Sequence, residues 1–197
     1  MSKRIKINKY LKSENIDTFL IDGKFIQKQD VPKFYFQDKI TFELPNKNET
    51  IHFVTSRAFN AIEIIDKILS KENIIKAGIA VYSIDKKATQ KIINYAESGQ
   101  IKDAVFLFST IRNDRGENLE TNYKILENSK NFKIGYYYSH SKVMTFETKN
   151  NYYTIEMSCN LAHNSRIENI TFYNNIDLFD FHHTWINKMV LNYIDNK

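Results

Sequence analysis

The stretch Ala77-Gly78-Ile79-Ala80-Val81-Tyr82 contains no charged side chain, and it predicts a β-strand that is covered on both faces. Apolar residues at helical spacing precede it, between about residues 59 and 69. After it, Asp85 can cap a helix that runs to about Ser98 and stops at Gly99. A buried strand between two helices is typical of an α/β fold.

The alternation of strands and helices continues from this strand to the end of the chain. The expected elements are strand 104–108, helix 117–128, strands 132–138, 143–146, 152–157 and 167–173, and a closing helix from about Leu178 to Tyr193 with an inner stripe of Phe181, Trp185, Met189 and Tyr193. This order predicts a mixed β-sheet with helices on both faces. Short strands separated by turn residues predict a β-rich N-terminal part in residues 1–55, packed on a main domain that spans residues 56–197.

The composition limits the classes of protein that the chain can represent. A length of 197 residues suits one well-packed domain, and the single Cys159 excludes an internal disulfide. The net charge of +5 favours partners that carry phosphate. We find no signal peptide and no run of about 18 apolar residues, so we expect a cytoplasmic protein that does not act at a membrane.

Five polar side chains near the carboxyl end form the strongest candidate for a site: His140, Lys142, Ser158, Asn160 and Glu168. Side chains two residues apart in an extended segment share a face, so His140 pairs with Lys142 and Ser158 pairs with Asn160. If the two segments are neighbours, one nucleophile and three donors meet at one point. Such a set suits a phosphodiester, because histidine can attack phosphorus while lysine and asparagine hold the phosphoryl oxygens.

These residues resemble the H-x-K, S-x-N and downstream glutamate of the phospholipase D superfamily, over roughly the last 140 residues. The resemblance implies a phospholipase D-like sheet and a metal-independent phosphodiesterase that needs no cofactor. It implies that His140 is the nucleophile, that Lys142, Ser158 and Asn160 bind the phosphate, and that Glu168 orients the imidazole. Two positions depart from the family pattern: Glu147 stands at the aspartate position, and Met157 stands where a small residue is usual. Alternation sends Glu147 to the face opposite Lys142, so we interpret it as structural.

The family reaction uses two histidines, and the chain contains one H-x-K motif. We therefore expect a homodimer whose active site is shared, with one His140 attacking and the other acting as the acid. The basic charge favours a nuclease that cleaves nucleic acid through a phosphohistidine. Arg112, Arg115 and Lys124 follow the carboxyl end of a strand, where they either contact the nucleic-acid backbone or belong to a solvated loop. Arg166 is a further expected contact to the substrate.

Two other functions remain open at this point. One is a lipid phosphodiesterase or phosphatidyl transferase, for which the sequence offers no basic amphipathic helix. The other is a module that binds DNA or a protein without cleaving. Four further residues are interpreted as structural and not functional. His163 is expected in a loop, His182-His183 as a pair on a helix surface, and Cys159 as a buried apolar side chain. The run Tyr136-Tyr137-Tyr138 either stacks on bases or belongs to the core and a dimer contact.

Overall fold

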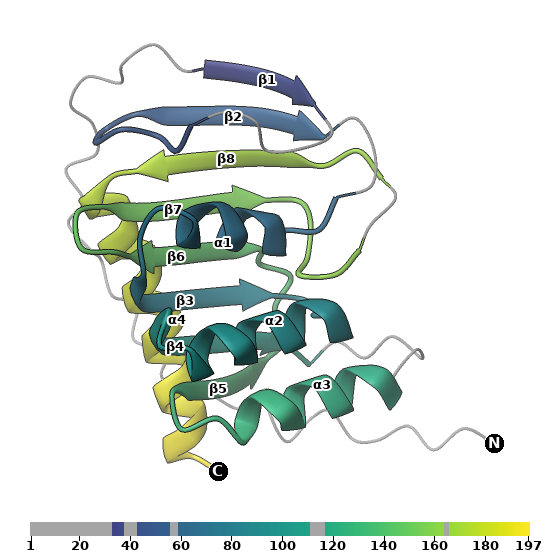
Figure 1. Cartoon of the computed structure of the whole chain (residues 1–197). Helices are drawn as coiled ribbons and strands as arrows, with labels where there is room; N and C mark the ends of the chain where they lie inside the picture. Colours follow the sequence, from purple (N-terminus) through teal and green to yellow (C-terminus); the bar gives the residue numbers. More distant parts are fainter. Residues whose placement is uncertain (1–32, 38–42, 56–58, 111–116, 164–165) are drawn as a thin grey trace.

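The computed structural model describes residues 33–37, 43–55, 59–110, 117–163 and 166–197, which build one mixed sheet (Figure 1). Its eight strands lie in the order β1-β2-β8-β7-β6-β3-β4-β5. The strands are β1 (Lys33–Gln37), β2 (Thr50–Thr55), β3 (Ile74–Val81), β4 (Ile101–Ser109), β5 (Phe132–Tyr137), β6 (Val143–Glu147), β7 (Tyr152–Met157) and β8 (Asn169–Asn174). The strand predicted at Ala77–Tyr82 is β3, and it lies inside the sheet.

The direction of each strand decides which ends meet. Strands β3, β4 and β5 are parallel to one another, whereas β6 is antiparallel to both β3 and β7. Strand β8 is antiparallel to β7 and to β2. The carboxyl ends of β2, β3, β4, β5 and β7 therefore lie at the same edge as the amino ends of β6 and β8. This edge is called the carboxyl edge below.

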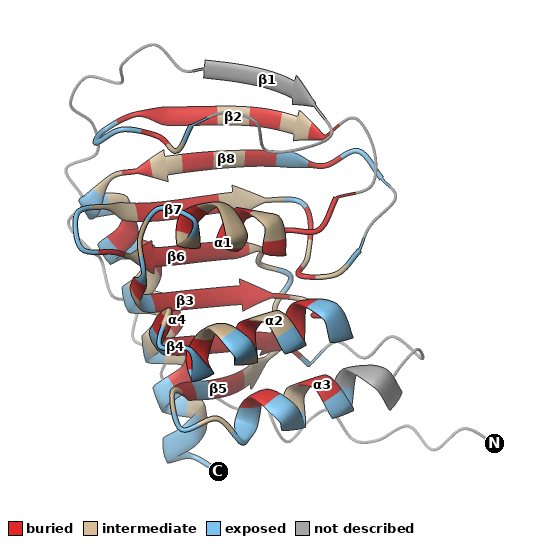
Figure 2. Ribbon diagram, viewed as in Figure 1, coloured by how far each residue is buried: buried red, intermediate tan, exposed pale blue. Residues whose placement is uncertain are grey.

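Helices cover both faces of the sheet, so the predicted fold class is confirmed. The helices are α1 (Ile62–Leu69), α2 (Lys86–Glu97), α3 (Glu117–Glu127) and α4 (Ile176–Asp195). Figure 1 shows α1, α2 and α3 on one face and α4 on the other. The strands are mostly buried, and each helix turns its buried residues toward them (Figure 2).

Local sequence explains where these helices begin. The Asp85 side chain accepts a hydrogen bond from the backbone N–H of Ala88 at 2.8 Å, which confirms Asp85 as the cap of α2. Asn175 caps α4 in the same way through the N–H of Leu178. Helix α1 begins without a side-chain cap, and its amphipathic pattern of buried isoleucines holds it to the sheet instead.

Part of the N-terminal segment joins the main sheet. Strand β2 pairs with β8, and β1 pairs with β2 in parallel. Residues 1–32 and 38–42 lie outside the described residues, and with them most of the predicted β-rich part in residues 1–55. The division of the chain at residue 55 stays a prediction.

The buried stripe of α4 differs from the predicted one. It consists of Phe179, His182, Ile186 and Val190, while Phe181 is 38% exposed. The expectation of a surface pair at His182-His183 is also wrong: His182 is 8% exposed, and the His183 ring stacks on Phe179. Burial of His182 is tolerated because both ring nitrogens are bonded, one to the Glu156 carboxylate and the other to the indole N–H of Trp185, each at 3.0 Å.

Close packing of β5 on α4 leads to a stability prediction. A Cβ added at Gly135 would lie 2.9 Å from the Val190 Cα, which is backbone and cannot turn away. We expect Gly135→Ala to lower the free energy of unfolding by about 1–3 kcal/mol, measured by urea denaturation. Lys133→Ala, at an exposed position in the same strand, is the control and should change it by less than about 0.5 kcal/mol. Equal stability of Gly135→Ala and wild type would contradict this packing.

Candidate active site

The five predicted site residues all lie at the carboxyl edge. His140 and Lys142 occupy the connection between β5 and β6, and Ser158 and Asn160 follow β7 directly. Glu168 immediately precedes β8. The sheet register brings these segments together: the backbone N–H of Met157 donates to the carbonyl of Lys142 at 3.1 Å, and that of Ser158 donates to the carbonyl of Asn169 at 2.9 Å.

His140 and Lys142 are in direct contact. The Lys142 ammonium lies 3.3 Å from Nδ1 and 3.5 Å from Nε2 of the imidazole, and it also donates to the His140 carbonyl at 3.2 Å. The His140 side chain is exposed, whereas Lys142 is half-buried. A solvent-accessible imidazole beside an ammonium can meet an anionic substrate with both groups at once.

Ser158 and Glu168 form a second pair. The Ser158 hydroxyl is hydrogen-bonded to the Glu168 carboxylate, and Ser158 Oγ accepts from the backbone N–H of Asn169 at 3.0 Å. Glu168 is 5% exposed, and its backbone bonds to Thr55 at the end of β2 in both directions. The carboxylate is therefore held between β2 and β7 at a fixed place.

Asn160 is oriented by the end of β3. Its Oδ1 accepts a hydrogen bond from the backbone N–H of Tyr82 at 3.1 Å. Among the described residues, its amide nitrogen donates no hydrogen bond, so the NH₂ group remains available to a ligand. The loop after Asn160 is held by Asp85, which bonds the backbone of Leu161 at 2.8 Å and that of His163 at 2.8 Å.

The electrostatics of the site depend on burial. Burial of the ammonium lowers the pKa of Lys142, and the nearby Glu168 carboxylate opposes that shift. Burial also raises the pKa of the Cys159 thiol to about 12, and Glu168 adds to the rise. Cys159 is fully buried, so it is a protonated, packed side chain, as the alternation of the strand predicts.

The structure does not bring every predicted group into contact. In the described part of the chain, His140 is hydrogen-bonded to Lys142 and not to Glu168, whose carboxylate faces Ser158. Lys124 and Arg166 are exposed, and Arg112 and Arg115 lie outside the described residues. Glu147 forms an ion pair with Lys76 at 2.9 Å at the other end of β6, so the structural interpretation of Glu147 is confirmed.

The sequence did not predict the residues that hold the site segments in place. Tyr82, Asp85 and Thr55 contact the site segments mainly through backbone groups. Of these, only Asp85 had a detectable signal, as a helix cap. Tyr136 is packed in the core against Tyr123, Tyr137 packs against α4, and Tyr138 is 69% exposed. The tyrosine run therefore divides between core and surface.

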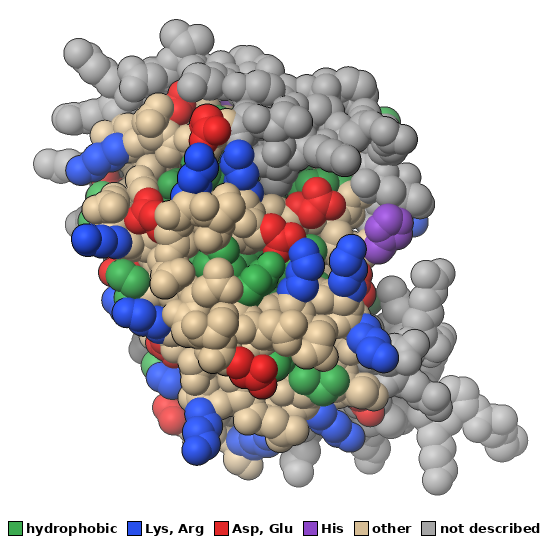
Figure 3. Space-filling view, in the orientation of Figure 1, with side chains coloured by type: hydrophobic (Ala, Val, Ile, Leu, Met, Phe, Trp, Pro, Cys, Tyr) green, Lys and Arg blue, Asp and Glu red, His purple; other side chains and the backbone are tan. Residues whose placement is uncertain are grey.

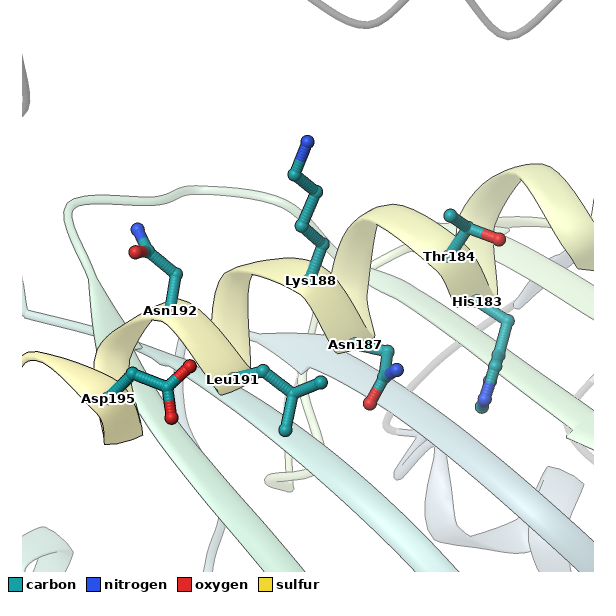
Figure 4. Close-up of a pocket in the computed structure, with 7 residues that line it drawn as sticks. All are labelled: His183, Thr184, Asn187, Lys188, Leu191, Asn192 and Asp195. Atoms are coloured by element: carbon teal, nitrogen blue, oxygen red, sulfur yellow. The ribbon is translucent and has the colours of Figure 1, made fainter. Parts of the chain in front are cut away.

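Other surfaces of the molecule are less distinctive. Figure 3 shows basic side chains at several separate places on the face of α1, α2 and α3, with acidic side chains between them. A pocket along α4 is lined by His183, Thr184, Asn187, Lys188, Leu191, Asn192 and Asp195 (Figure 4). None of the five predicted site residues lines it.

The described residues contain neither a metal-binding cluster nor a membrane-spanning helix. No three His, Cys, Asp or Glu side chains in these parts of the chain lie close enough together to hold a metal ion. No described helix has the length and apolar character needed to span a membrane.

Comparisons with known proteins identify the fold. The sequence matches no model of a protein family and no curated protein sequence. In structure, the chain is similar to Nuc from Salmonella typhimurium, a phospholipase D family member, with a TM-score of 0.51 and 13% identity over 74% of this chain and 96% of that one. It is also similar to NucT from Helicobacter pylori, with a TM-score of 0.51 and 16% identity over 72% of this chain and 97% of that one. The resemblance to the phospholipase D superfamily is therefore confirmed at the level of the fold.

The electrostatics of Lys142 can be tested without any substrate. In NMR titrations of isotope-labelled lysines, we expect the Lys142 amine to titrate below the ordinary lysine pKa, because burial disfavours its charge. Glu168→Gln should lower the pKa of Lys142 further, since the carboxylate attracts the ammonium. Glu147→Gln is the matched control, and it should instead lower the pKa of Lys76, which Glu147 raises. Titration of Lys142 at the ordinary lysine pKa would contradict the assignment.

Proposed function

We propose that this chain is a metal-independent phosphodiesterase that cleaves nucleic acid through a phosphohistidine. The observation that carries the proposal is the contact of the exposed His140 imidazole with the Lys142 ammonium, at 3.3 Å, on the sheet edge that also holds Asn160 and the Ser158–Glu168 pair. A nucleophile next to phosphate-binding donors is what in-line attack on phosphorus requires.

In the first step, a ring nitrogen of His140 attacks phosphorus with its lone pair. The P–N bond forms while the bond from phosphorus to the leaving oxygen breaks, and that oxygen takes a proton from a second imidazole. Lys142 and the NH₂ group of Asn160 bind the non-bridging oxygens, where negative charge grows. Ser158 assists them from its place beside Glu168.

In the second step, water attacks phosphorus and gives its proton to the second imidazole. The P–N bond breaks, and the electron pair returns to the His140 ring. We assign Glu168 the role of orienting the His140 imidazole and stabilising its positively charged form. This role requires the imidazole to turn away from Lys142 when the phosphate takes over the ammonium.

The second imidazole comes, in this proposal, from His140 of another copy of the chain. The exposed apolar side chains around the site support such a pairing. Tyr138 is 69% exposed and Ile167 is 64% exposed, and no other large apolar side chain of the described residues exceeds 43%. Tyr138 lies two residues before His140, and Ile167 immediately precedes Glu168. A two-fold pairing across this edge would cover both side chains and bring two half-sites together.

Nucleic acid is the proposed substrate because of the net charge of +5 and the exposed cations Arg166 and Lys124. Arg166 belongs to the loop between Asn160 and Glu168, and Lys124 belongs to α3. Arg112 and Arg115 complete the proposed backbone contacts. These cations would contact phosphates on either side of the cleaved bond, so binding should weaken as the salt concentration rises.

The central prediction concerns His140. In a plasmid-nicking assay that contains EDTA, wild type should cleave, whereas His140→Asn should lose about 10⁴-fold or more of the activity, since it lacks both nucleophile and acid. His52→Asn is the control, because His52 lies on β2 and bonds Thr171, and it should cleave like wild type. Strict dependence on a divalent metal would refute the mechanism. Salt-sensitive DNA binding without turnover would favour a non-catalytic module.

The shared site predicts a defined oligomeric state. Wild type should sediment as a dimer in analytical ultracentrifugation. The double variant Tyr138→Asp/Ile167→Asp should sediment as a monomer, because charges would replace the apolar side chains in the interface, and it should lose cleavage activity. Ile194→Asp, at a 42% exposed position on α4, should remain a dimer. A wild-type monomer with full activity would rule out the shared site.

A further inference from the structure

We infer that Tyr82 is a positioning residue of this site, which holds the His140 ring and the Asn160 amide in place without touching the substrate. Tyr82 immediately follows β3 at the carboxyl edge. The kinetic test of this inference rests on the proposed function, because it measures turnover. The NMR test below uses no substrate and does not depend on that function.

The first contact is with the segment that follows β7. The backbone N–H of Tyr82 donates to Asn160 Oδ1 at 3.1 Å. Beyond this bond, Ile84 and Leu161 form a parallel β-bridge, and the backbone N–H of Asp85 donates to the Leu161 carbonyl at 2.8 Å. Residues 82–85 therefore run beside the Asn160 loop as a short extra pairing. This pairing determines which end of the Asn160 amide faces outward.

The second contact is with the proposed nucleophile. The rings of Tyr82 and His140 have centroids 5.8 Å apart at an interplanar angle of 58°. His140 is exposed, and its ring is bonded to the Lys142 ammonium and lies against the Tyr82 ring. An exposed histidine with fewer contacts would sample several rotamers, so the Tyr82 ring restricts the directions in which the imidazole can point.

Tyr82 itself is supported from the side of α3. The Tyr123 hydroxyl donates to the Tyr82 carbonyl at 3.4 Å, and the buried Asn122 donates from its amide to the Ile84 carbonyl at 3.1 Å. Tyr123 in turn stacks on Phe108 of β4, with ring centroids 4.3 Å apart. Tyr82 therefore connects the packed residues of α3 and β4 to the exposed His140 imidazole.

The hydroxyl of Tyr82 indicates which part of the side chain matters. This oxygen is buried and has no hydrogen-bond partner among the described residues. A buried hydroxyl without a partner destabilises the fold, whereas the ring contacts His140. The ring is therefore the useful part, and phenylalanine should replace tyrosine without loss. A hydroxyl that bound the phosphate directly would predict the opposite.

Steady-state kinetics can separate these roles. We expect Tyr82→Leu to lower kcat by about 10- to 100-fold with KM within about twofold of wild type, since the nucleophile loses its alignment while the cationic groups still bind. Tyr82→Phe should restore kcat to within about twofold of wild type, with a thermal midpoint that is equal or higher. The substrates are a DNA oligonucleotide and bis(4-nitrophenyl) phosphate, both assayed in EDTA.

Tyr95→Leu is the matched control. The Tyr95 hydroxyl bonds Asp66 at 2.6 Å and joins α2 to α1, so this variant should lose stability and keep the wild-type kcat. Equal losses of kcat in Tyr82→Phe and Tyr82→Leu would show that the hydroxyl contacts the substrate, and would overturn the inference. Full activity of Tyr82→Leu would also overturn it.

A measurement without substrate keeps the inference separate from the proposed function. In wild type, the ring current of Tyr82 should shift the NMR signals of the His140 imidazole away from those of a freely rotating histidine. The shift should persist in Tyr82→Phe and disappear in Tyr82→Leu. This pattern in an inactive wild type would refute the proposed function and support the role of Tyr82. Unshifted His140 signals in wild type would refute that role whether or not the protein cleaves.

Discussion

The antiparallel pairing of β6 with both of its neighbours is the constraint on which the site depends. Val143 lies opposite Ala80 of β3 on one side and opposite Glu156 of β7 on the other. The connection that enters β6 must therefore pass between the end of β3 and the end of β7. It carries His140 and Lys142, so these side chains meet groups that are distant in the sequence.

The packing of the central strands fixes this register. Thr145 of β6 lies opposite Gly78 of β3, and a Cβ on Gly78 would come within 2.6 Å of Thr145 Oγ1 and 2.9 Å of His183 Nδ1. The glycine leaves room for a threonine and a histidine from two other elements. A slip of one residue would bury the side chains of the other face, Lys142 among them, against α4. The packing that fixes the register of β6 therefore also fixes the position of Lys142.

Sequence patterns predicted the parts of the protein that depend on local order. The apolar run of β3, the Asp85 cap and the alternation that separates Lys142 from Glu147 all follow from residues near one another in the chain. The stripe of α4 could not be predicted in the same way, because it depends on Glu156 and Trp185 satisfying a buried histidine. The Ser158–Glu168 pair and the contacts of Tyr82 arise from sheet pairing across long separations, for which a single sequence carries little signal.

The two departures from the family pattern have different consequences. Glu147 is at the far end of β6 and pairs with Lys76, so it does not take part in the site. Met157 lies next to the site: its backbone N–H bonds the Lys142 carbonyl, and its side chain packs against the core. Lys142 is half-buried, and burial lowers the pKa of its ammonium. A half-buried ammonium interacts more strongly with a phosphoryl oxygen than a fully solvated one does, because less water screens the two charges. Met157 is therefore compatible with the proposed chemistry, because its backbone holds the Lys142 segment and its side chain packs into the core.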